Sequence, residues 1–119
     1  MVVLLLACVT ESPMVGLTTS DGGGWELALD AVTYDQGASD VVVTVTPLDA
    51  ATATGLTLFL RPDMEDMTHT RDVVHFDERE QGVYSAEMVL DMSGLWTLTG
   101  YVGEPERMEA ITFIVEALS

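Results

Sequence analysis

The segment Trp25–Pro47, WELALDAVTYDQGASDVVVTVTP, decides the fold class. In its first nine residues, large apolar side chains alternate with acidic or small ones, which is the period of a strand with one buried face. Val41–Thr46 is β-branched throughout and ends at Pro47, which has no N–H to donate to a central strand. Tyr34–Asp40 lies between the two runs and contains Gly37, so we expect two strands joined by a turn.

Five more short apolar runs follow, most of them bounded by Pro or Gly, and no window shows a sustained helical period. This pattern predicts an all-β fold, an antiparallel immunoglobulin-like β-sandwich of about seven strands, with a small closed barrel as the alternative. The cysteine pair of true immunoglobulin domains is missing, because Cys8 is the sole cysteine. The further expected strands are Leu56–Leu60 (stopped by Pro62), Val73–Phe76, Val83–Leu90, Leu95–Val102 and Met108–Glu116.

The length of 119 residues fits one domain, and its charge is strongly acidic. Twenty acids against four arginines give a net charge of −16, which repels nucleic acid and anionic lipid headgroups. A salty habitat or export from the cell accounts for this acidity without a binding function. The sequence has no glycine-rich phosphate loop and no nucleophile beside a base in a recognisable context, so we expect a protein that is not an enzyme.

The N-terminus carries an apolar run, Met1–Ala7, directly before Cys8. Leu5-Leu6-Ala7-Cys8 resembles the lipobox of bacterial lipoproteins, in which the signal is cut before the cysteine and that cysteine is acylated. The run has no basic segment before it and is shorter than a usual signal, which a start codon assigned too late would explain. We expect lipidation at Cys8; the alternative is a short N-terminal strand with an inert buried cysteine.

The stretch after Cys8, VTESPMVGLTTSDGGG, is rich in Ser, Thr and Gly. Such a composition is typical of a flexible spacer that holds a domain away from a membrane. We therefore expect residues 1–24 to be a lipoprotein signal remnant and spacer, and residues 25–119 to form the sandwich domain.

The segment Arg61–Arg71, RPDMEDMTHTR, combines two methionines, one histidine and three acids between two apolar runs. Antiparallel strands place successive loops at alternate ends, so this segment shares an end with the turn Asp91–Gly94. Thioethers are soft ligands and imidazole an intermediate one, and together they favour Cu(I) over zinc or calcium. Met67 and His69 are two residues apart and point to one side of an extended segment. The candidate metal ligands are Met64, Met67, His69 and Met92.

Other roles for these residue types stay open. Methionine is also a flexible core filler, and loop methionines can fold over the end of a sandwich. Met88 shares a strand face with Tyr84 and Leu90, so we expect it in the core, and we expect His75 on an exposed strand face. Met14 lies in the expected spacer and Met108 at the opposite end, which removes both from the ligand set. A hard-cation site from Asp63, Glu65, Asp66 and Asp72 matches no calcium-loop spacing.

The segment Leu56–Leu98 holds five short elements in a fixed order, namely Arg61-Pro62-Asp63-Met64, Met67-Thr68-His69, Gly82-Val83-Tyr84, Met92-Ser93-Gly94 and Trp96. In the order and spacing of these elements the segment resembles the YtkA-like domain, a family related to the periplasmic part of FixH-type proteins. The resemblance implies a small immunoglobulin-like domain, often tethered as a lipoprotein or by one helix, with some members linked to copper delivery for oxidase assembly. It also implies Met64, Met67, His69 and Met92 as site residues; the acids Asp63, Glu65 and Asp66 depart from the usual pattern.

These observations predict an exported binding module on the periplasmic or other extracytoplasmic side, attached to the membrane through a lipid anchor alone. We expect it to bind or pass Cu(I) through the Met/His segment for cuproenzyme assembly, with an oxidase subunit or another copper protein as partner. The alternative is a metal-free accessory domain of the cell envelope that contacts another protein through an edge strand or the acidic loop.

Overall fold

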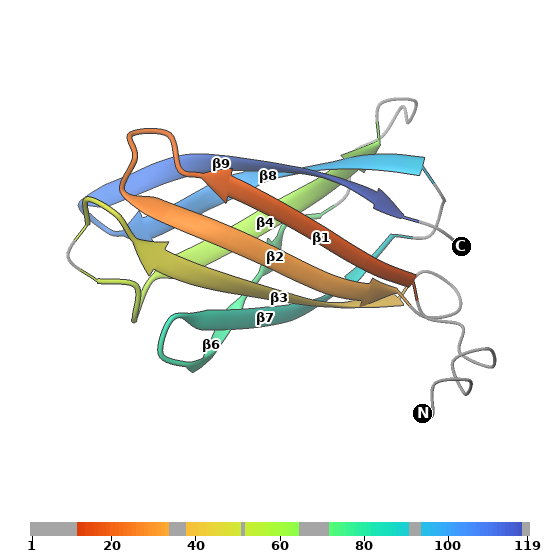
Figure 1. Cartoon of the computed structure of the whole chain (residues 1–119), viewed down its shortest axis with the longest axis horizontal. Coiled ribbons are helices and arrows are strands. Elements are labelled where there is room, and N and C mark those ends of the chain that lie inside the picture. Colours follow the sequence, from red (N-terminus) through yellow and green to blue (C-terminus); the bar gives the residue numbers. More distant parts are fainter. Residues whose placement is uncertain (1–11, 34–37, 51, 65–71, 91–93, 118–119) are drawn as a thin grey trace, which may run out of the picture.

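The computed structural model describes residues 12–33, 38–50, 52–64, 72–90 and 94–117 of the chain (Figure 1). The described residues form strands and turns and contain no helix. The strands are β1 (Ser12–Thr19), β2 (Trp25–Thr33), β3 (Ala38–Pro47), β4 (Thr57–Met64), β5 (Val74–His75), β6 (Asp77–Glu80), β7 (Val83–Val89), β8 (Gly94–Glu104) and β9 (Arg107–Ala117).

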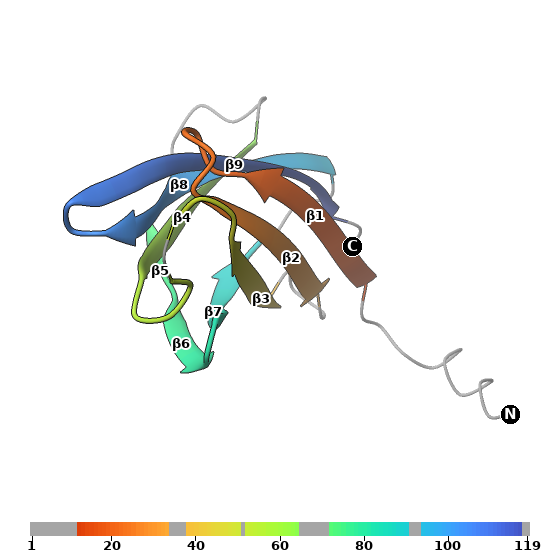
Figure 2. The same cartoon turned by 60° about the vertical axis from the view of Figure 1, so that its left-hand side comes forward.

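The strands form two antiparallel sheets, which confirms the predicted all-β sandwich. One sheet has the order β1-β2-β3-β7-β6, and the other has the order β5-β4-β8-β9. The chain changes sheets at Phe76, between β5 and β6, where the Phe76 N–H donates to the Leu58 carbonyl at 2.9 Å (Figure 2). On the opposite side of the molecule, β1 packs beside β9.

The core lies between the sheets and follows the alternation seen in the sequence. Trp25, Leu27 and Leu29 of β2 are all 2% exposed or less, and the residues between them face outward. The other sheet contributes the buried side chains of Trp96 and Phe113. Each fully buried side chain of this size contributes about 1.5–3 kcal/mol relative to an exposed one, so these alternating positions determine which face of each strand turns inward.

Strand β4 runs further than the sequence predicts. We expected Pro62 to end it, but β4 continues to Met64 and pairs with β8 through Pro62 and beyond. The short strand β5 pairs with β4 only opposite Phe59 and Leu60. Among the described residues, β5 does not pair with β4 at Pro62, and a residue without an N–H is tolerated at such a position.

The prediction of a flexible spacer is wrong for Ser12–Thr19. This segment forms β1 and pairs with β2 along its whole length. The sandwich therefore begins before Trp25. Gly16 lets β1 pack closely against Phe113 of β9, because a Cβ at this position would stand 3.1 Å from the Phe113 ring. The Gly22-Gly23-Gly24 run is the β1–β2 turn, in which Gly22 and Gly23 have φ values of 104° and 77°. These values favour glycine.

Candidate metal-binding site

The ends of β4 and β8 meet at one end of the sandwich, on the right-hand side of Figure 1. Met64, the last residue of β4, is the register partner of Trp96, and β8 begins two residues earlier at Gly94. The segment 65–71 therefore starts, and the segment 91–93 ends, at neighbouring strand positions. This arrangement confirms the prediction that the two segments share an end.

Met64 lies on the core-facing side of β4, where it is half-buried and packs against the core. Its terminal methyl carbon, Cε, lies 2.9 Å from the position that a Cβ at Gly94 would take. Gly94 has a φ of 132°, a conformation that side-chain-bearing residues rarely adopt. A glycine at this position therefore leaves the space that the Met64 side chain uses.

The other candidate ligands, Met67, His69 and Met92, lie outside the described residues, as does the proposed lipidation site Cys8. The structure thus places one of the four candidate ligands, Met64, and the strand ends that lead to the other three. Within the described ranges, no group of three or more His, Cys, Asp or Glu side chains could hold a metal ion.

The remaining methionines and histidine are placed as follows. Met88 is 1% exposed and belongs to the core, and His75 is exposed beside Phe59, as predicted. Met108 lies at the start of β9, at the far end from Met64. Met14 was excluded as a spacer residue, and that reason is wrong. It lies near the start of β1, opposite Ala31, and Figure 1 shows that β1 starts at the end of the sandwich where β4 ends.

A groove of about 300 Å³ lies next to this end, between β4 and β7. Its apolar wall includes Pro62 and Met88, and Asp72 and Glu87 add two carboxylates. Asp63, another acid of the hard-cation alternative, instead pairs with Arg61 at 3.1 Å. The two described acids of the hard-cation alternative are therefore separated, since Asp72 lines the groove and Asp63 belongs to an ion pair.

The YtkA-like family model matches residues 24–100 of the chain. This chain belongs to the YtkA-like family. The matched region covers β2 to β7 and most of β8, so it includes Met64 and the strands that flank both loop segments at its end. No curated protein and no solved structure matches the chain. In the described part of this YtkA-like domain, no helix is long and apolar enough to cross a membrane.

At the opposite end, the YtkA-like domain is closed by a carboxylate that local sequence reasoning missed. The Glu109 carboxylate accepts hydrogen bonds from Ser20 Oγ at 2.6 Å, the Gly24 N–H at 2.9 Å and Arg107 Nε at 2.7 Å. The Ser20 bond, followed by those from Arg107 and Gly24, lowers the pKa of Glu109 despite its burial. The signal in the sequence is an acid in the inward register of β9, two residues before Ile111.

Arg107 links this carboxylate to two other elements of the YtkA-like domain. Its guanidinium carbon lies 5.3 Å from the centre of the Trp25 ring, within the range of a cation–π contact. Its Nη2 atom lies 3.3 Å from the Asp49 carboxylate. The Trp25 indole N–H donates to the Thr52 carbonyl at 2.7 Å. These contacts join β2, β9 and the 48–52 segment to one another, so we assign them a role in stability and not in ligand binding.

Tyr84 fixes the 52–56 loop of the YtkA-like domain at the same end. Its hydroxyl donates to the Ala53 carbonyl at 2.8 Å and accepts from the Leu56 N–H at 3.0 Å. Burial raises the pKa of the Tyr84 hydroxyl. Glu78 accepts from Thr54 Oγ1 at 2.7 Å and the Gly55 N–H at 2.9 Å, which lowers the pKa of its carboxyl.

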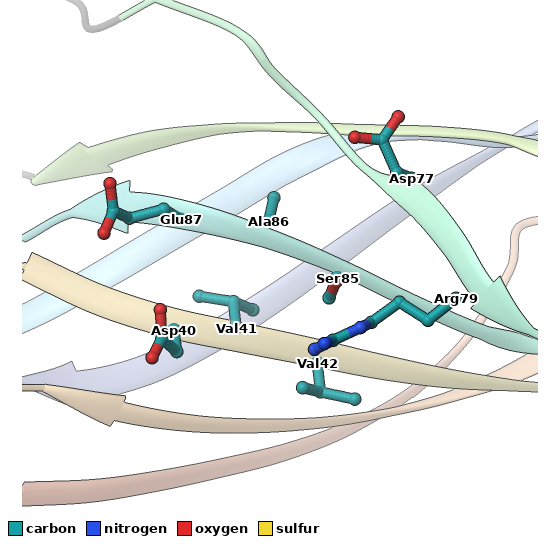
Figure 3. Close-up of a pocket in the computed structure, with 8 residues that line it drawn as sticks. All are labelled: Asp40, Val41, Val42, Asp77, Arg79, Ser85, Ala86 and Glu87. Atoms are coloured by element: carbon teal, nitrogen blue, oxygen red, sulfur yellow. The ribbon is translucent and has the colours of Figure 1, made fainter.

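The outer face of the five-stranded sheet carries a broad acidic groove of about 580 Å³ across β3, β7 and β6 (Figure 3). Asp40 and Glu87 are register partners on β3 and β7, and Figure 3 shows their carboxylates on the same face. Asp77 and Arg79 of β6 line the same groove. Like charges directly opposite each other in a sheet repel, so the Asp40–Glu87 pair is a local cost to stability.

Proposed function

We propose that this YtkA-like domain is an exported, lipid-anchored binding module that binds or passes Cu(I) through Met64, Met67, His69 and Met92. The observation that carries the proposal is the contact between Met64 and the Gly94 position, since it joins the strand ends that bear the two ligand segments. The family membership and the soft character of thioether and imidazole donors support it.

The proposed donors fit a monovalent soft cation better than a hard one. Thioethers bind Cu(I) without losing a proton, so the site needs no thiolate. Met64 would be the donor whose backbone is fixed by β4, while Met67, His69 and Met92 would come from the two segments beside it. A site of three or four such ligands could release copper to a partner, which we propose to be an oxidase subunit or another copper protein.

A competition titration with a Cu(I) chelator tests the copper proposal. The Met67→Leu/His69→Ala variant should bind Cu(I) at least about tenfold more weakly than the wild type, since two soft donors are removed. The matched control is Met108→Leu/His75→Ala, which removes a methionine and a histidine outside the proposed site. Equal affinities for the wild type and the Met67→Leu/His69→Ala variant would end the proposal.

Lipidation at Cys8 is a separate part of the proposal and has its own test. In bacterial cells, the wild-type chain should fractionate with membranes, and its N-terminal peptide should carry the mass of acyl chains. Cys8→Ser should move the protein to the soluble fraction of the envelope. An unmodified cysteine in the mature protein, or equal fractionation of both forms, would reject the anchor and leave the copper proposal to its own experiment.

A metal-free accessory domain of the envelope is the second candidate function, and the edge strand β1 favours it. None of the eight residues of β1 is charged, and its Val15 and Leu17 side chains are 71% and 68% exposed. An uncharged edge strand can pair with a strand of another chain. The chelator titration separates the two functions, because an accessory domain would bind no Cu(I) at the methionine segment.

A further inference from the structure

The outer face of the four-stranded sheet is apolar and exposed. Of nine large hydrophobic side chains that are exposed in the described chain, four belong to β8 and β9 and a fifth, Val73, directly precedes β5. The Phe59 ring contacts those of Tyr101 and His75 in a tilted arrangement, with ring centres 5.8 Å and 5.5 Å away. We define the apolar face as the outward side chains Phe59, Val73, Leu95, Tyr101 and Ile114 with the threonines between them.

The apolar face is nearly free of charge, although the whole chain carries −16. Its arginine, Arg61, pairs with Asp63 at 3.1 Å, and Glu116 lies at its rim opposite Leu95. By contrast, the outer face of the five-stranded sheet bears acids on four strands, namely Glu26, Asp30, Asp40, Asp77 and Glu87. The outer face of the five-stranded sheet is therefore acidic except at β1, whereas that of the four-stranded sheet is apolar. Exposed apolar patches of this kind mark interaction sites.

We propose that the apolar face is a homodimer interface, in which two copies pack their four-stranded sheets against each other. This proposal does not rest on copper binding or on the lipid anchor. Packed sheets lie about 10 Å apart, so the two acidic faces of such a dimer would be separated by three sheet spacings, about 30 Å. That distance is several times the Debye length of about 8 Å at physiological salt, so the repulsion between the copies is screened.

The polar groups of the apolar face also suit a second copy. A two-fold interface brings each surface against itself, so its polar groups must be able to pair with their own kind. Thr97, Thr99 and Thr112 face outward between the apolar side chains, and a threonine hydroxyl both donates and accepts hydrogen bonds. Among the described residues of this face, Arg61 is paired with Asp63, so the centre of the face offers a charged partner no unpaired charge.

The size of the apolar face is near that of a stable interface. Strands β8 and β9 have eleven residues each, which corresponds to about 36 Å at ~3.3 Å per residue. Four strands at ~4.8 Å spacing span about 19 Å, and the shorter β4 and β5 reduce the area of the sheet from about 680 Å² to about 500 Å². Because side chains project from the sheet, the accessible surface of this face is larger than the flat area of the sheet. This brings it toward the ~800 Å² per partner of a standard interface.

The oligomeric state of the full chain tests the proposal. By sedimentation equilibrium at about 0.15 M salt, the wild type should have twice its chain mass of 12.8 kDa. Ile114→Asp should raise the dissociation constant roughly a hundredfold, because each of the two copies would bury an unpaired carboxylate in the interface. Raising the salt from about 0.01 M to about 0.15 M should tighten the wild-type dimer, because the Debye length falls from about 30 Å to about 8 Å and the repulsion between two acidic copies becomes screened.

The matched control is Leu17→Asp, on the outer side of β1. Leu17 is 68% exposed and Ile114 is 66% exposed, so the two variants add the same charge at equal exposure on opposite sheets. Leu17→Asp should leave the dimer intact, and circular dichroism should show that both variants are folded. A wild type that remains at 12.8 kDa at every concentration overturns the proposal, even if another protein binds this face. Equal dissociation by both variants also overturns it.

Discussion

Ser20 and Glu109 are 89 positions apart in the sequence, and the Ser20 hydroxyl donates a 2.6 Å hydrogen bond to the Glu109 carboxylate. This bond joins the β1–β2 turn of one sheet to β9 of the other. The same hydroxyl accepts from the Trp25 N–H at 3.0 Å. The turn is thereby held in place over a buried acid, and its glycines fit closely: a Cβ at Gly24 would stand 3.0 Å from the carboxylate.

Glu109→Ala should lower the free energy of unfolding by about 1–3 kcal/mol. The substitution leaves the Ser20 hydroxyl, the Gly24 N–H and Arg107 without their shared acceptor, and buried donors without partners carry a cost of this size. Urea unfolding at one protein concentration measures the change. The control is Glu106→Ala, which removes an exposed acid three residues away and should change stability by less than about 0.5 kcal/mol.

The acid side of the stability profile should depend on Glu109. Its pKa is lowered in the folded protein, chiefly by the Ser20 hydrogen bond. The carboxylate therefore stabilises the fold fully above the usual pKa of a glutamate, and this contribution is lost as the pH falls through the lowered folded value. Unfolding curves of the wild type and Glu109→Gln should differ at neutral pH and converge in acid. A constant difference between them would contradict this assignment.

Tyr84→Phe should destabilise the protein by about 1–3 kcal/mol, because the Ala53 carbonyl and the Leu56 N–H both lose their partner. Tyr101→Phe is the control, since Tyr101 is 47% exposed. Burial raises the pKa of Tyr84, so its contribution is present below the usual tyrosine pKa and is lost as the pH rises through the raised value. The deficit of Tyr84→Phe relative to the wild type should therefore shrink in strong alkali.

Glu87→Gln should stabilise the protein by roughly 0.2–1 kcal/mol, because it removes the like charge directly opposite Asp40. Thermal unfolding at low salt measures the gain, which should shrink as added salt screens the repulsion. Glu26→Gln is the matched control, since Glu26 has Thr19 and Thr46 as its register partners. An equal gain in both variants would mean that overall charge, and not the cross-strand pair, limits stability.

Gly94→Ala should destabilise the protein by more than about 1 kcal/mol, since it combines an unfavourable φ with a Cβ placed 2.9 Å from Met64 Cε. A double-mutant cycle with Met64→Ala isolates the contact: removing the Met64 side chain should reduce the cost of Gly94→Ala. Gly55→Ala serves as the control, because Gly55 has a φ of 71° and no atom within 4 Å of its Cβ position. Its cost should not depend on Met64.

The alternation of apolar and polar residues was sufficient to predict strands that have one buried and one exposed face. Trp25–Thr33 alternates strictly, and β2 has these bounds. Strand β6, Asp77–Glu80, is charged and exposed throughout, so no apolar period marks it. Strand β1 resembles a linker in composition because glycine is common in flexible segments. In β1, however, Gly16 lets the strand approach Phe113.

The candidate site was predictable only as far as strand order determines it. Successive antiparallel strands bring the end of β4 beside the start of β8, so the placement of Met64 near the 91–93 segment follows from the sequence. Whether Met67, His69 and Met92 converge on one site depends on loop conformation, which the alternation of apolar and polar residues does not determine. Their convergence stays a prediction. Glu109 was missed because its partner Ser20 is distant in the sequence and lies in a stretch expected to be a spacer.

The position of β1 has a consequence for how the proposed anchor would orient the domain. Strand β1 begins at Ser12, four residue steps after Cys8, and four steps of extended chain reach at most about 14 Å. A lipid on Cys8 would therefore keep the Met64 end of the sandwich close to the bilayer and turn the Glu109 end away from it. Copper at Met64 would then exchange most readily with a partner embedded in the same membrane.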